Sequence, residues 1–205
     1  MPIDLPKPPR NVARAAERRA AEWAGRGGFA RLVWAPRESL GARRETSLAA
    51  PHQIYTANLD VLVDPGSVEK AAAPTAWSFL IEERDRPVAA TEVNISMPAE
   101  TPAQLAEGPF VEAVAEELQT IESLLPLREA HFELRQLRVP ALQLAALWLH
   151  SGERDDVFVP LKPAPPPLEA HVPYPEARFV AVVSKLARSM IDAHQSGDEP
   201  DRLGS

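Results

Sequence analysis

Residues 130–161, AHFELRQLRVPALQLAALWLHSGERDDVFVPL, form the densest apolar run of the chain. Residues 132–135 alternate apolar and charged side chains, which is typical of a half-buried strand. Residues 151–156 are turn formers, and the β-branched and aromatic run 157–159 after them favours another strand. The stretch therefore predicts the central strands of an antiparallel sheet.

The segment 142–149 inside this stretch allows two interpretations. Nearly every position in it is apolar, as in a strand that is covered on both faces. Pro140 interrupts the preceding strand because proline has no N–H for the ladder, yet the same residue suits the first turn of a buried helix. Three strands are the favoured prediction, and a helix over 141–149 stays open.

Alternating apolar residues predict further strands on the N-terminal side. A strand is expected over residues 53–64, where every second residue from Tyr55 is apolar. A turn and a single turn of helix over residues 67–73 should follow it. Residues 76–83 and 88–96 alternate in the same way and predict a β-hairpin.

Two later segments have helical spacing. Residues 109–125 place large apolar side chains on one stripe, with Pro109 suited to the first turn. A second amphipathic helix is expected over residues 175–194. Between the central strands and this helix, residues 162–173 contain the run KPAPPP and predict a stiff, polyproline-like connector.

The N-terminal region combines a proline-rich start with an alanine- and arginine-rich helix over residues 10–24. The apolar stripe of this helix is thin, and its members are Val12, Ala16, Ala20 and Trp23. Such a stripe buries little area, so the helix needs a surface from elsewhere to hold it. The glycines at residues 25–28 end the helix, and a short apolar piece follows at residues 29–34.

These elements together predict an α+β fold. We expect a mainly antiparallel β-sheet of about five to six strands with two long amphipathic helices packed on one face, plus an N-terminal helical arm. The predicted division is a basic arm at residues 1–50, a single α+β core domain at residues 51–195 and a disordered tail at residues 196–205.

The net charge of −7 hides an uneven distribution. Residues 1–50 contain ten Lys and Arg against five Asp and Glu, whereas residues 51–205 contain twelve against twenty-four, a net charge of −12. The absence of cysteine excludes disulfides and thiolate metal sites. No signal-peptide pattern and no long apolar run is present, so a cytoplasmic location is the expectation.

Two polar groups are candidate sites. His150 lies close in sequence to Glu153, Asp155 and Asp156, a set that can bind a cation or transfer protons but is more typical of a solvated turn. His131, Glu133, Glu92 and Trp148 are the residues expected to line a ligand pocket, if the sheet is curved and covers one. The same alternation is expected for the solvent face of a half-covered sheet. No cofactor, metal site or catalytic residue is predicted, because no serine-hydrolase elbow or phosphate-binding loop is found.

The favoured function is that of a non-enzymatic interaction or scaffold protein. Its contacts would come from the basic helix, through Arg10, Arg14, Arg18, Arg19 and Trp23. A protein partner or a second copy is expected, although the helix can also dock on its own chain. Nucleic acid is unlikely to bind because of the net charge of −12 on residues 51–205, and the alanine content of the stripe argues against a membrane. The alternative is a small-molecule-binding or enzymatic domain with a pocket between curved sheet and helices.

Overall fold

A computed structural model describes residues 3–25, 46–83, 86–95, 103–124, 131–152 and 154–197. The apolar piece at residues 29–34 and the tail beyond residue 197 lie outside these ranges. The chain divides into two compact units, which are residues 1–54 with 75–134 (unit 1) and residues 55–74 with 135–205 (unit 2). Because a compact unit need not fold independently, the predicted boundaries at residues 50 and 195 stay predictions.

The central stretch folds as three strands, as predicted. They are β6 (Phe132–Val139), β7 (Leu144–His150) and β8 (Val157–Pro160). The helix alternative for residues 141–149 is wrong, because only a single 3-10 turn forms, over Pro140–Leu142. Gln143, directly after this turn, has a left-handed backbone conformation with φ 50°. Positions 146–149 of β7 are all buried, so this strand is covered on both faces.

Nine strands of the described residues belong to one sheet, in the order β5-β4-β3-β2-β6-β7-β8-β9 with β1 beside β6. The remaining strands are β1 (Ile3–Asp4), β2 (Thr46–Thr56), β3 (Ala73–Glu83), β4 (Arg86–Asn94), β5 (Gln104–Ala106) and β9 (Tyr174–Pro175). The pairs β3–β4, β4–β5, β7–β8 and β8–β9 are among those that are antiparallel, and β1–β6 is parallel. The fold is therefore α+β with a mostly antiparallel sheet. The predicted number of strands is too low because β1, β5 and β9 are too short to show a period.

The described chain has five α-helices instead of the two long core helices and one arm that were predicted. They are α1 (Arg10–Gly25), α2 (Leu59–Leu62), α3 (Val68–Ala71), α4 (Pro109–Leu124) and α5 (Glu176–Gly197). The predictions for α1, α4 and α5 are confirmed, although α5 runs three residues past residue 194 into the predicted tail. The short helix α3 lies inside the predicted turn of helix at residues 67–73.

The strand predicted over residues 53–64 is only half correct. β2 ends at Thr56, and α2 takes up the second half of the segment. The alternation of apolar residues continues through both halves, but within α2 it is Leu62 that is buried, whereas Val61 is 43% exposed. Over so few residues, the alternation of a strand cannot be distinguished from the first turn of a helix by the positions of apolar residues, which explains the error.

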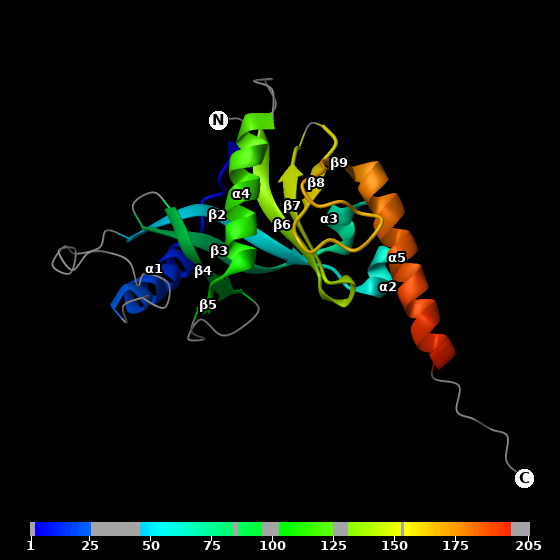
Figure 1. Ribbon diagram of the computed structural model, residues 1–205, viewed down its shortest axis with the longest axis horizontal. Coiled ribbons are helices and arrows are strands. Elements are labelled where there is room, and N and C mark those ends of the chain that lie inside the picture. Colours follow the sequence, from blue (N-terminus) through cyan, green and yellow to red (C-terminus); the bar gives the residue numbers. More distant parts are fainter. Residues whose placement is uncertain are drawn as a thin grey trace, which may run out of the picture. The chain divides into compact units, whose positions relative to one another are not determined.

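In unit 1, the helix α1 is part of the core. Its buried residues are the four predicted from the stripe: Val12, Ala16, Ala20 and Trp23. They pack on apolar residues of β3 and β4, among them Trp77, Phe79, Ile81, Ala89 and Val93. Figure 1 shows α4 in front of these strands and α1 behind them, and residues 76–81 of β3 are all buried. The predicted arm is therefore docked on its own unit.

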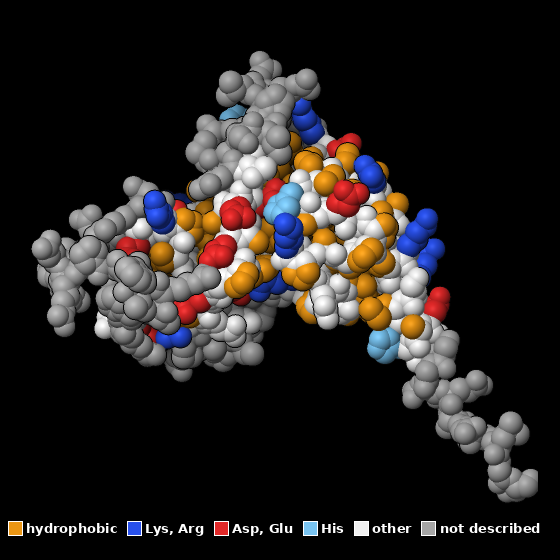
Figure 2. Space-filling view, in the orientation of Figure 1, with side chains coloured by type: hydrophobic (Ala, Val, Ile, Leu, Met, Phe, Trp, Pro, Cys, Tyr) orange, Lys and Arg blue, Asp and Glu red, His pale blue; other side chains and the backbone are white. Residues whose placement is uncertain are grey.

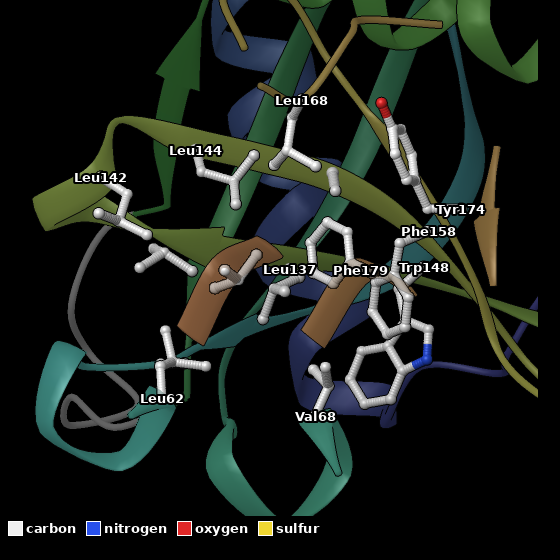
Figure 3. Close-up of a cluster of buried hydrophobic side chains, with 14 of the residues drawn as sticks. Leu62, Val68, Leu137, Leu142, Leu144, Trp148, Phe158, Leu168, Tyr174 and Phe179 are labelled. Atoms are coloured by element: carbon white, nitrogen blue, oxygen red, sulfur yellow. The ribbon is translucent and has the colours of Figure 1, made fainter. Parts of the chain in front are cut away.

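In unit 2, an apolar cluster between the sheet and α5 forms the core (Figure 3). Trp148 and Phe158 are cross-strand partners on β7 and β8, and their rings stack with centroids 5.5 Å apart. The ring of Phe179 on α5 stacks on Phe158 at 4.4 Å. Such aromatic pairs contribute about 0.5–1.5 kcal/mol beyond the area that they bury. The stack therefore joins α5 to the centre of this part of the sheet.

The proline-rich segment 162–173 is more than a connector. Leu168 is 4% exposed and belongs to the core cluster of unit 2, while the backbone N–H of His171 donates to the carbonyl of Pro160 at 3.0 Å. Several of its prolines remain exposed, namely Pro163, Pro166, Pro167 and Pro173. Figure 2 shows many hydrophobic side chains, which include prolines, over this part of unit 2. Leu168 therefore anchors the segment on the core, with Ala164 and Val172 packed beside it.

We expect Phe158→Ala to destabilise the protein by about 3–5 kcal/mol, since it removes a fully buried ring from the middle of the aromatic stack. Urea denaturation measures the change. Val61→Ala, at a side chain that is 43% exposed, is the control and should change the stability by less than about 0.5 kcal/mol. Equal losses for the two variants would contradict the packing described.

Candidate functional site

The outer side of α1 presents three arginines to solvent. Arg10, Arg14 and Arg18 follow one another at intervals of four residues, and all three are exposed. No hydrogen bond or ion pair links any of them to another residue that the structure describes. We call these three residues the arginine face of α1. Among the described residues, the opposite, apolar side of the helix is buried and this face is exposed.

The other two residues predicted for contacts on α1 are engaged within unit 1. The guanidinium of Arg19 donates to the carboxylate of Glu22 at 3.0 Å. Trp23 is only 8% exposed, and its indole N–H donates to the carboxylate of Glu107. Trp23 therefore fastens the end of the helix to its own unit.

The predicted pocket residues are not brought together in unit 1. His131 is 75% exposed at its side chain and lies 3.5 Å from the carboxylate of Asp4. Glu133 is next to Asp4 in the parallel pair β1–β6, whereas Glu92 lies on β4. The strands β3 and β2 separate β4 from β6 in the sheet, a distance of roughly 14 Å. Trp148 belongs to unit 2 and is fully buried.

The most elaborate polar cluster among the described residues lies in unit 2, around the buried carboxylate of Asp156. Its Oδ2 accepts from the indole N–H of Trp148 at 2.6 Å and from Nδ1 of His150 at 3.1 Å. Its Oδ1 accepts from the backbone N–H of Ser151 at 2.8 Å. A carboxylate only accepts hydrogen bonds, so the Nδ1 of His150 carries a proton. This contact directs Nε2 of His150 away from Asp156.

Arg135 lies beside His150 and is held by aromatic rings. Its guanidinium carbon is 5.1 Å from the ring centroid of Tyr55 and 5.0 Å from that of Trp148. The two rings meet edge to face, with centroids 5.0 Å apart. Cation–π contacts of this kind favour a fixed position of a guanidinium, because its flat face rests on the ring. The side chain of Arg135 is 11% exposed.

One carboxylate faces both the guanidinium of Arg135 and the imidazole of His150. Oε1 of Glu69, on α3, is 3.7 Å from NH1 of Arg135 and 3.9 Å from Nε2 of His150. Both distances are longer than a hydrogen bond. The side chain of Glu69 is 59% exposed, in contrast to the 19% of His150. An exposed acid is thus loosely placed beside two well-anchored basic groups.

The structure describes three of the four residues of the candidate cluster around His150. Asp156 contacts His150, Asp155 is exposed, and Glu153 lies outside the described residues. No group of three or more acidic or histidine side chains with the geometry of a metal site is found in the described part of the chain. Sequence reasoning missed Arg135 and Glu69, since neither is near His150 along the chain. The one local signal was the position of Arg135 in the alternating strand.

Comparison with protein-family models, with curated proteins and with solved structures gave no match. None of the described helices is both long and apolar enough to cross a membrane.

We expect Asp156→Asn to destabilise the protein by about 1.5–3 kcal/mol, because an amide cannot accept all three hydrogen bonds that the carboxylate accepts. Chemical denaturation measures the loss, and the indole N–H signal of Trp148 in a ¹H–¹⁵N spectrum should move. Asp155→Asn makes the same change at an exposed neighbour and should leave both readouts unchanged. A stable Asp156→Asn variant with an unmoved indole signal would show that the carboxylate does not organise the cluster.

Proposed function

We propose that this is a non-enzymatic interaction protein whose arginine face on α1 binds an acidic surface of a protein partner. One observation supports this most directly. The helix has an apolar side that is occupied by packing within unit 1 and a second side with three exposed arginines that no described residue neutralises. A cytoplasmic setting for the interaction is part of the proposal and comes from the sequence alone.

The geometry of the arginine face suits a protein ligand. Residues four apart on a helix are about 6 Å apart along its axis, so the three guanidinium groups cover a length of about 12 Å. A guanidinium group can form two parallel hydrogen bonds with one carboxylate. Such a contact depends on the relative orientation of the two groups as well as on their charges. Because α1 is already docked, little backbone order has to be gained on binding.

The charges around the arginine face favour protein over nucleic acid. Glu17 and Glu22 are exposed on the same helix, so the face is a row of cations beside carboxylates and not a uniformly positive surface. Such mixed patterns select a complementary partner, whereas phosphate binding depends on net positive charge. A second copy of the chain, with its net charge of −12 over residues 51–205, also meets the requirement for an acidic partner.

The test is charge reversal on the arginine face. We expect the double variant Arg14→Glu with Arg18→Glu to bind the partner at least about tenfold more weakly, because cations that met carboxylates are replaced by like charges. The partner is identified by native mass spectrometry of the tagged full chain from its own source, which also detects a second copy. Its dissociation constant is then measured by calorimetry at two salt concentrations, and binding should weaken in the higher one.

The matched control is the double variant Lys162→Glu with Lys185→Glu. It makes the same change in net charge at two exposed lysines of unit 2. The control should bind like the wild type. Unchanged binding by the arginine variant, or equal weakening by both variants, would reject the assignment of the arginine face, and so would a bare monomer from the native source.

A further inference from the structure

We propose that Arg135 and His150 form a binding site for the oxyanion group of a small ligand, a carboxylate or a phosphate, and that the carboxylate of Glu69 occupies this place in the free protein. The site lies within unit 2 and is independent of the arginine face of α1. Its ligand class follows from the two groups that converge there, a guanidinium and an imidazole.

Both groups are held in place by buried or partly buried partners. The Asp156 carboxylate, 7% exposed, fixes the ring of His150 with Nε2 pointing outward. The rings of Tyr55 and Trp148 fix the guanidinium of Arg135. β6 and β7, which supply these two residues, are neighbours in the sheet. Donors placed on adjacent strands keep their separation, which is the preorganisation that a binding site requires.

The position of Glu69 shows where an anion is stabilised. A single oxygen, Oε1, faces both Arg135 and His150 at 3.7 Å and 3.9 Å. A ligand oxyanion at the same place can approach to hydrogen-bond distance, which Glu69 does not reach. Since Glu69 is largely exposed and lies on a helix of four residues, its carboxylate can swing into solvent. It therefore acts as a weak internal competitor.

The hydrogen-bond roles of the two ring nitrogens of His150 set a condition for binding. With Nδ1–H donating to Asp156, the outward Nε2 donates to an anion only in the imidazolium form. Among the described residues, the carboxylates of Asp156 and Glu69 face the ring, and the guanidinium of Arg135 lies beside Glu69. Anion binding is therefore measured at several pH values between about 5 and 8.

The deciding variant is Glu69→Gln, which removes the competing charge and keeps the size of the side chain. The full-length protein is titrated with inorganic phosphate and, separately, with acetate, at constant ionic strength. The readout is the indole N–H of Trp148, one of four tryptophans, because this group shares the acceptor Asp156 with His150. Its signal is assigned by its displacement in Asp156→Asn.

We expect the Glu69→Gln variant to bind the anion at least about tenfold more tightly than the wild type. The matched control is Glu169→Gln, which makes the same change in charge at another exposed glutamate of unit 2 and should bind like the wild type. Adding Arg135→Lys to Glu69→Gln should weaken binding again, because lysine lacks the planar guanidinium that rests on the two rings. Phosphate that binds without acetate assigns a phosphate ligand, and the reverse assigns a carboxylate.

A purely structural ion pair makes the opposite prediction. In that case Glu69→Gln lowers stability and neither anion shifts the indole signal. That result, or an equal gain in affinity for Glu69→Gln and Glu169→Gln, would overturn the assignment. The circular dichroism spectrum and urea midpoint of each variant, measured on the same samples, show whether the fold is retained.

Discussion

The buried carboxylate of Asp156 is the constraint on which the organisation of unit 2 depends. Its side chain holds Trp148 and His150 of β7, and its backbone carbonyl accepts from the N–H of Glu176, the first residue of α5, at 2.9 Å. The carboxylate of Glu176 in turn accepts from the N–H of Val68, the first residue of α3, at 2.9 Å. A buried carboxylate is tolerated only when its oxygens accept hydrogen bonds, and those of Asp156 do. Through these bonds and its backbone carbonyl, Asp156 links β7 to the start of α5, and Glu176 continues the link to the start of α3.

The strands β6 and β7 contribute to both the apolar core and the polar cluster of unit 2. Leu137 and Ala146 lie in the cluster under α5, whereas Arg135 and His150, further along the same strands, reach the polar cluster. Trp148 joins the two regions, because its ring packs in the core while its N–H binds Asp156. In unit 1, apolar and basic residues are separated within a single helix, because α1 has its apolar residues on one side and its exposed arginines on the other.

Elements with a sustained local period could be predicted from the sequence. The three strands of residues 132–160, the hairpin of β3 and β4, and the helices α1, α4 and α5 each show an apolar run, an alternation or a helical spacing within their own residues. The strands β1, β5 and β9 could not be predicted, because two or three residues have no period. The error at residues 57–64 has the same origin, since alternation from β2 continued into residues that form α2.

The sequence by itself determined the whole buried stripe of α1, whose four members are the four predicted. It did not do so for α4, where Val111 and Glu117 are buried although neither belongs to the predicted stripe. Only the tertiary structure decided what those faces meet. Two contacts show this: Trp23 donates to Glu107, and Glu69 lies beside Arg135 and His150. Both depend on which strands and helices are packed next to each other. Local periodicity depends on neighbours along the chain, whereas these contacts join residues far apart in it, and nothing in their local sequence specifies the partner.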